Sequence, residues 1–163
     1  MDKMFQKILS LTSVSLISDK NAEITSVQSK FEGCENLEFF NKTGFNTADI
    51  KTISRIFYGC FSLDKIYIEN FDTSNVEDMS YAFSNILISS FNFEKIKIKN
   101  LKNASHMFYE SSYLSDINFS VLSATKLEDI SYIFGSCSAL QQLNLNNLNF
   151  ENVKNMSDLF SEV

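Results

Sequence analysis

Proline and tryptophan are absent from this chain of 163 residues, which also has only one histidine, three cysteines and four glycines. The lack of proline excludes a proline-rich linker. A single histidine, His106, excludes a metal site built on two histidines, and four glycines leave little room for a phosphate-binding loop. We read His106 as a solvent-facing helix residue. We expect a protein that is not an enzyme, with no catalytic residue, metal or cofactor.

Basic charge is also scarce, because 20 acidic residues outnumber 14 lysines and arginines and give a net charge of −6. A nucleic-acid-binding surface would be basic, so we expect no nucleic-acid partner. The apolar stretch 8–17 is interrupted by Ser and Thr, so it is too short and too polar to span a membrane and is a poor match to the apolar region of a signal peptide. The chain as it stands is predicted to be cytoplasmic, whereas a fragment of a longer surface protein would lie at the cell surface.

What the chain does have is a repeat. One phenylalanine recurs at intervals of 26 residues, with a single interval of 25. Its positions are Phe5, Phe31, Phe57, Phe83, Phe108, Phe134 and Phe160. A period of this length indicates one structural unit that is repeated and stacked, so that each copy buries its apolar face against its neighbours. Residues 1–163 are therefore predicted to form a single solenoid domain of about six units.

The first half of each unit has the pattern of a strand. The apolar residues are Leu63, Ile66 and Ile68. Ile66 and Ile68 are separated by one residue, which is the alternation typical of a strand with one buried face. The repeat carries this pattern along the chain, so successive strands must be parallel. The expected strands, in one sheet, cover 13–16, 39–42, 65–68, 90–93, 116–119 and 142–145.

The second half of each unit has helical spacing. Val76, Met79 and Phe83 recur at i, i+3 and i+7, and Ser74 with Glu77 reads as a capping box. We expect helices on the side opposite the sheet, at 22–31, 48–57, 75–83, 100–108, 126–134 and 151–160. The predicted fold class is an α/β solenoid of β–α units.

The string from Cys60 to Phe83, CFSLDKIYIENFDTSNVEDMSYAF, resembles a known repeat. It is similar to the unit of BspA-like leucine-rich repeat surface proteins and to the related mycoplasma lipoprotein repeat of unknown function. The segment FDTSNVEDMS carries most of the specificity. The resemblance covers residues from about 5 to 160, and it implies a right-handed leucine-rich-repeat superhelix that is used for adhesion or protein recognition.

The three cysteines, Cys34, Cys60 and Cys137, occupy one position of the repeat. Ile8 and Ile86 stand at the same position in other units, which indicates a buried packing site. Stacked neighbours would be about a strand spacing apart, which is longer than a disulfide allows. We expect three reduced, buried thiols, and neither a disulfide nor a metal site.

The outward face of the predicted sheet is the candidate binding surface. Its residues alternate with the buried ones, and they are polar and rich in Asn apart from two aromatic side chains. The candidate contacts are Phe39, Asn41, Lys65, Tyr67, Glu69, Asn92, Asp116, Asn118 and Asn144. Aromatic groups set among Ser and Asn suit protein recognition. Alternatively, the stacked Asn side chains form a hydrogen-bonded ladder on a solvated sheet.

The sequence thus predicts a module that recognises a protein partner of unknown identity, centred on Phe39, Lys65, Tyr67 and Glu69. It would be an adhesin-type surface fragment or a small cytoplasmic immunity protein or inhibitor that neutralises a toxin or enzyme. A further alternative is a structural protein that self-associates through its end units. There, Met4 and Phe5 at one end and Met156 and Phe160 at the other lack a neighbour.

Overall fold

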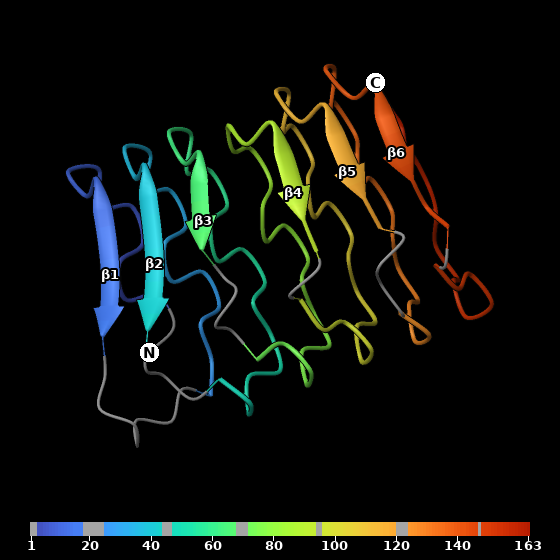
Figure 1. Ribbon diagram of the computed structural model, residues 1–163, viewed down its shortest axis with the longest axis horizontal. Coiled ribbons are helices and arrows are strands. Elements are labelled where there is room, and N and C mark those ends of the chain that lie inside the picture. The colour runs from blue at the N-terminus through green and yellow to red at the C-terminus, as the bar shows by residue number, and fades with distance from the viewer. Residues whose placement is uncertain are drawn as a thin grey trace.

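The computed structural model describes residues 3–17, 25–43, 47–67, 72–93, 96–119, 124–146 and 148–163. In these residues the chain winds into stacked rungs, each with one short parallel strand (Figure 1). The strands are β1 (Ser13–Ile17), β2 (Phe39–Thr43), β3 (Lys65–Tyr67), β4 (Ser90–Asn92), β5 (Asp116–Asn118) and β6 (Gln142–Asn144). All six begin at the residue predicted from the repeat, so the strand prediction is confirmed.

The strands form two sheets instead of the one that was expected. β1, β2 and β3 pair in parallel, as do β4, β5 and β6, but no ladder joins β3 to β4 among the described residues. Within each sheet, paired residues are one repeat apart, as in Phe39 opposite Lys65. The break coincides with the one unit that is a residue short, and Figure 1 shows a wider separation between β3 and β4 at that place.

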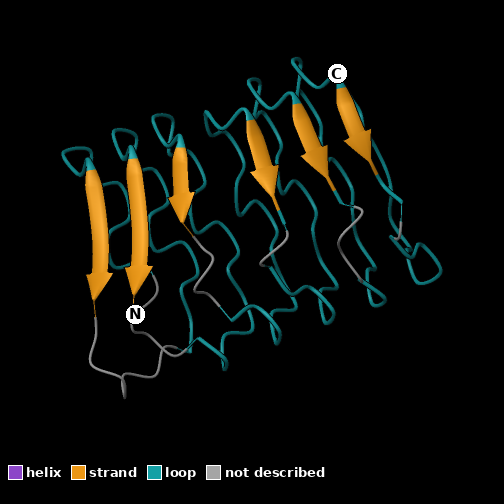
Figure 2. Cartoon of the chain, in the orientation of Figure 1, coloured by secondary structure: helices purple, strands orange, loops and turns teal. Residues whose placement is uncertain are grey.

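The helix prediction is wrong for the residues that the structure describes, which contain no helix (Figure 2). The expected helical stretches instead contain consecutive turns. The centre of each stretch is a turn segment of six residues that includes the repeated phenylalanine. The seven turn segments are 3–8, 29–34, 55–60, 81–86, 106–111, 132–137 and 158–163. They stack on one another on the side of the rungs away from the strands (Figure 1).

Left-handed residues are what prevent a helix from forming. The first and fifth residues of every turn segment have positive φ, for example Arg55 at 55° and Gly59 at 70°. Non-glycine residues seldom adopt this conformation, because it crowds the Cβ atom against the backbone. Within each turn segment the two left-handed residues lie four positions apart. They turn the chain before an α-helical hydrogen bond can form. Gly33, Gly59 and Asn85, which are residue types that tolerate this conformation, all have positive φ.

Backbone hydrogen bonds alternate between two directions in the turn segments. The N–H groups of Arg55, Phe57 and Gly59 donate to carbonyls of the next rung, at 3.0, 3.1 and 3.2 Å. The N–H of Tyr58, which lies between them, donates back to Arg55 of its own rung at 3.3 Å. This alternation satisfies buried backbone groups while tying each rung to the next. We call the resulting set of bonds between rungs the turn ladder.

The expected capping boxes have a different role. In place of a helix cap, the Asp78 carboxylate accepts a hydrogen bond from the Ser80 N–H at 2.9 Å, which forms a local turn. Equivalent bonds recur at Thr52, Asn103, Asp129 and Asn155. Glu77, the expected capping partner, instead accepts from the Lys102 ammonium of the next rung at 2.6 Å.

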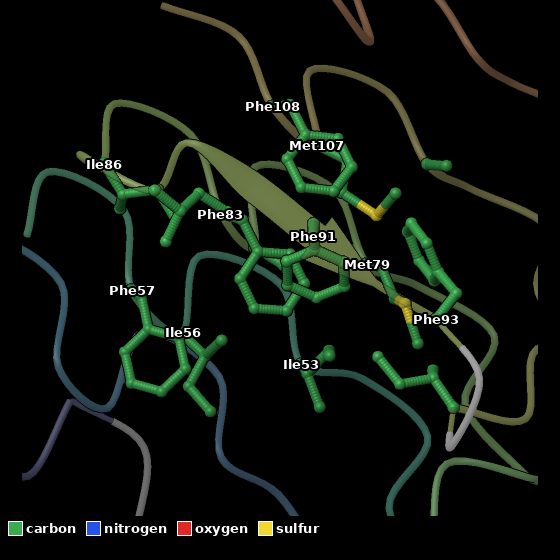
Figure 3. Packing of buried hydrophobic residues seen from close by; sticks show 14 of the residues in the cluster. Ile53, Ile56, Phe57, Met79, Phe83, Ile86, Phe91, Phe93, Met107 and Phe108 are labelled. Atoms are coloured by element: carbon green, nitrogen blue, oxygen red, sulfur yellow. The ribbon is translucent and has the colours of Figure 1, made fainter. Parts of the chain in front are cut away.

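The repeated phenylalanines form a continuous stacked column in the core. Successive ring centroids lie 5.4–6.2 Å apart. All but the two terminal rings are at most 1% exposed. Around Phe83, residues of the strand side such as Phe91 and residues of the turn side such as Met79 close the core (Figure 3). The column therefore continues across the gap between β3 and β4 and connects the two sheets.

The cysteine position combines packing with a hydrogen bond. All three thiols are free and buried, as expected. Each donates to the carbonyl of the phenylalanine one rung earlier, as Cys60 does to Phe31 at 3.1 Å. In the unit without Cys or Ile, the Ser111 hydroxyl makes the same bond to Phe83 at 2.9 Å. The position thus favours a small buried donor.

Shortening Phe83 to Ala should lower the free energy of unfolding by about 3–5 kcal/mol, because it leaves a cavity in the middle of the column. Urea denaturation of the variant and of the unmodified chain measures the difference. A loss below about 1 kcal/mol would mean that the column does not form the core.

The thiols should react with a thiol reagent only when the protein unfolds. Burial raises the pKa of all three, to about 11 for Cys137, so the reactive thiolate is scarce in the folded chain. Labelling followed by mass spectrometry should show fast modification in denaturant and slow modification without it. A native disulfide or stoichiometric zinc in the same spectra would contradict this assignment.

Candidate functional site

The predicted contact residues lie on the strand side, but the gap between β3 and β4 divides them into two groups. Phe39, Asn41, Lys65 and Tyr67 lie on β2 and β3. Asp116, Asn118 and Asn144 lie on β5 and β6. Asn92 is part of β4, but its side chain is outside what the structure describes, and Glu69 lies outside the described residues altogether. The structure therefore brings together three of the four residues of the predicted centre, namely Phe39, Lys65 and Tyr67.

Phe39 and Tyr67 form an aromatic pair on this face. Their ring centroids lie 5.6 Å apart, at an interplanar angle of 53°. Phe39 is half-buried, whereas Tyr67 is 44% exposed. The two rings are held by the parallel register, which places Phe39 opposite Lys65 and Asn41 opposite Tyr67. Two aromatic side chains that already pack on each other lose little conformational entropy when a partner binds. Aromatic residues are common at the centre of protein interfaces.

An open hollow of about 350 Å³ adjoins this pair. It lies where the chain enters β2 and β3 and where the gap in the sheet begins. Its lining residues are Glu38, Phe39, Ser62, Asp64, Lys65 and Leu87. The lining thus combines two apolar side chains, Phe39 and Leu87, with two carboxylates and one ammonium group. Such a hollow could receive a side chain that has an aliphatic stem and a polar or basic tip.

The origin of the hollow is the shortened unit. Two residues normally separate the cysteine position from the next buried apolar residue, as Phe61 and Ser62 do between Cys60 and Leu63. The fourth unit has only Leu87 there, which is 42% exposed. Sequence reasoning identified the missing residue but not its consequence, so it missed Glu38, Asp64 and Leu87. The irregular spacing was the signal that could have located them.

The second group of contact residues is flatter and more polar. Asp116 and Asn118 are exposed on β5, and Asn144 is half-buried on β6. The Asn144 side-chain oxygen accepts a hydrogen bond from the N–H of Asn146 at 3.0 Å, a local turn and not a bond between strands. The described side chains of this group are Asp and Asn, whereas the first group contains the aromatic pair and adjoins the hollow.

The turn side carries a second aromatic cluster, which sequence reasoning did not predict. The His106 ring lies between Tyr81 and Tyr132, with centroids 4.3 and 4.7 Å away and nearly parallel planes. The Arg55 guanidinium lies over the other face of Tyr81 at 4.5 Å. All four occupy the first position of a turn segment, where stacking of rungs superimposes their side chains. His106 is therefore half-buried in a stack, which corrects its reading as a solvent-facing helix residue.

The environment of His106 disfavours its charged form. Burial lowers the pKa of the imidazole below its ordinary value; Arg55 acts in the same direction and Asp129 opposes it. Its buried Nδ1 atom has no hydrogen-bond partner among the described residues, so protonation there would leave a buried N–H unsatisfied. These features give the histidine a structural role in the stack.

The fold should consequently lose stability as the pH falls below about 6.5, the ordinary histidine value. Because the pKa of His106 is lower in the folded chain, the unfolded chain binds the proton first as the pH falls. The contribution of neutral His106 to the free energy of unfolding is therefore complete above about pH 6.5, and it is lost as the pH falls toward the pKa of the folded state. His106→Tyr, which matches Tyr81 and Tyr132, should remove this component while keeping the stack. Urea midpoints at pH 7.5 and 5.5 measure the effect. An equal fall in both proteins would show that His106 contributes nothing to it.

The described residues contain no group of His, Cys, Asp and Glu side chains that could hold a metal ion. Nor does any helix in this part of the chain have the length and apolarity to cross a membrane. The described surface thus presents an aromatic pair, an adjoining hollow and the charges around it.

Comparison with known proteins identifies the family. The family described as "Mycoplasma protein of unknown function, DUF285" matches residues 25–123 and, in a second overlapping match, residues 88–163, and the chain belongs to it. No curated protein sequence matches the chain. Among solved structures, the leucine-rich repeat protein TpLRR of T. pallidum is similar, with a TM-score of 0.56 and 19% identity. The similarity covers 91% of this chain and 62% of TpLRR, so the chain spans less than two thirds of that protein.

A leucine-rich repeat protein from Bacteroides ovatus also matches, with a TM-score of 0.34 and 18% identity, over 96% of this chain and 63% of that protein. The likeness to TpLRR establishes the leucine-rich-repeat solenoid fold and confirms the expected family resemblance. A fold of this kind consists of stacked repeats, each of which contacts mainly its neighbours.

Proposed function

We propose that this member of the family recognises a protein partner through the strand side of its N-terminal half. The contact centre comprises the aromatic pair of Phe39 and Tyr67 together with the adjoining hollow, which Phe39, Lys65 and Leu87 help to line. The observation that carries the proposal is the exposure of Tyr67, which pairs with Phe39, and of Leu87, which lines the adjoining hollow. The solenoid itself does not require an aromatic group at the position of Tyr67, since its equivalents in other rungs are Ser and Asn.

The charges around the hollow favour a basic contact from the partner. Glu38 and Asp64 are both exposed there, against the single ammonium group of Lys65. A lysine or arginine side chain could place its stem on Phe39 and Leu87 and its charged end near the carboxylates. The net charge of −6 also attracts a basic partner over longer distances.

Two biological roles use the same face. An adhesin-type contact would operate at the cell surface, whereas an inhibitor or immunity protein would neutralise a toxin or enzyme in the cytoplasm. The genes beside this one distinguish the two roles. An adjacent toxin gene supports the inhibitor, and an upstream secretion signal in a longer reading frame supports the adhesin.

Tyr67→Ala should weaken partner binding by about 2 kcal/mol or more, which is about 30-fold in Kd, because it removes the exposed half of the aromatic pair. Affinity capture from native lysate with the unmodified chain as bait identifies the partner, and calorimetric titration then gives each Kd. Folding should be nearly unchanged, since the side chain faces solvent.

Phe150→Ala is the matched control, because Phe150 is also an exposed aromatic residue, at 38%, but lies in the last rungs, far along the chain from the hollow. It should leave the Kd within about twofold. A partner that binds Tyr67→Ala and the unmodified chain equally well would rule out this face as the contact centre.

A further inference from the structure

Three neighbouring corners of the solenoid carry large exposed apolar side chains. A corner is the segment in which the chain passes from a turn segment to the next strand, along the upper edge of the rungs in Figure 1. The corners before β2 to β6 are 35–38, 61–64, 87–89, 112–115 and 138–141. Phe61, Leu87 and Tyr113 lie in the corners before β3, β4 and β5 and are 43, 42 and 61% exposed. We call these three residues the apolar edge.

The fold does not require apolar side chains at these positions. The corner before β2 has Glu35 and Asn36 there, and the corner before β6 has Ser138 and Ala139. Other corner residues fill the core, as Leu63 does, which is fully buried. Apolar side chains that are exposed on consecutive rungs are typical of an interaction site.

Acidic groups accompany the apolar edge. Glu35, Glu38 and Asp64 are exposed in the corners before β2 and β3, and Glu110 is exposed in the turn segment that precedes the corner before β5. The ammonium group of Lys65, at the start of β3, opposes them. The partner segment that complements this surface is therefore apolar on one side and basic beside it.

The spacing of the apolar edge matches one side of an α-helix. Neighbouring rungs are about 4.8 Å apart, so Phe61 and Tyr113, which are two rungs apart, are separated by about 10 Å along the solenoid axis. Residues i and i+7 of a helix lie on one side and about 10.5 Å apart, with i+3 or i+4 between them. A helix along the axis would thus place one apolar residue on each of the three rungs. One face of an extended strand repeats only every 6.7 Å or about that distance, which fits the rungs less well.

The hollow joins the apolar edge to the strand side. Leu87 belongs to both, and Ser62 and Asp64 of the neighbouring corner also line the hollow. A lysine or arginine of a helix on the apolar edge would therefore reach the hollow. Its stem would lie on Leu87 and its charged end at Asp64.

We propose that the apolar edge binds a basic amphipathic helix of the protein partner, with the apolar stripe of the helix on Phe61, Leu87 and Tyr113. The inference rests on the proposed function, to which it adds the kind of segment that the partner contributes. The apolar edge and the strand side then form one recognition surface around the hollow.

Selection from a library of random peptides tests the inference without knowledge of the partner. The unmodified chain is the bait, and the peptides have about 15 residues, which is enough for about four helical turns. Enriched peptides should carry lysine or arginine together with apolar residues at i, i+3 or i+4, and i+7. Enrichment of acidic peptides, of peptides with strictly alternating apolar residues, or of none would overturn the proposal.

Phe61→Ser with Tyr113→Ala should weaken binding of the most enriched peptide by about 30-fold or more in Kd, measured by fluorescence anisotropy. This double variant should fold, because the corner before β6 already has Ser138 and Ala139 at the two positions. Phe150→Ala is the control, since Phe150 is exposed but lies outside the corners, and it should leave the Kd unchanged. Added salt should weaken binding, because the acidic groups are exposed.

Tyr67→Ala separates this inference from the proposed function. Equal binding of the peptide by the unmodified chain and the double variant would overturn the apolar edge as its site. If Tyr67→Ala weakens binding in that case, the strand side alone recognises the peptide and the proposed function stands. A dimer of the unmodified chain in sedimentation, abolished in the double variant, would make a second copy the occupant and would also overturn the proposal.

Discussion

The hydrogen bond from a left-handed residue to the next rung is the constraint on which the rest of the structure depends. Arg55 and Gly59 show its geometry: each has positive φ and donates to a carbonyl of the following rung. Because these bonds recur in each turn segment from 3–8 to 132–137, rungs stack in one register. That register superimposes the phenylalanines in a column, brings each buried thiol to the carbonyl of an earlier phenylalanine, and places His106 between two tyrosines.

The two sides of the rungs respond differently to the shortened unit. The turn ladder runs without interruption across the rung where the residue is missing, since the N–H groups of Tyr81, Phe83 and Asn85 donate to the next rung at 3.0, 3.0 and 2.8 Å. The strand side breaks at the same place into two sheets and leaves the hollow beside Phe39 and Leu87. A regular column of turns therefore supports a strand surface that is interrupted between β3 and β4. The proposed recognition centre lies at this interruption. Function can vary on one side of such a fold while the other side maintains stability.

The period of the repeat was sufficient to predict the solenoid, the start of every strand and the buried phenylalanines, because burial in a stack depends on spacing. It could not distinguish a helix from a series of turns. Val76, Met79 and Phe83 are buried as a helical stripe would require, yet the backbone between them is turned by Tyr81. Tyrosine and histidine at left-handed positions give no local signal, since only glycine and asparagine are usual there. The hollow was missed because it arises from contact between rungs.

Scalar couplings across hydrogen bonds, measured by NMR on labelled protein, test the turn ladder most directly. The account predicts a coupling between the amide of Phe57 and the carbonyl of Ala82, 25 residues away in the next rung. An α-helix over the same residues would instead couple that amide to the carbonyl of Ile53, four residues earlier in the same rung. Observation of the Phe57–Ile53 coupling, without the one to Ala82, would contradict the account.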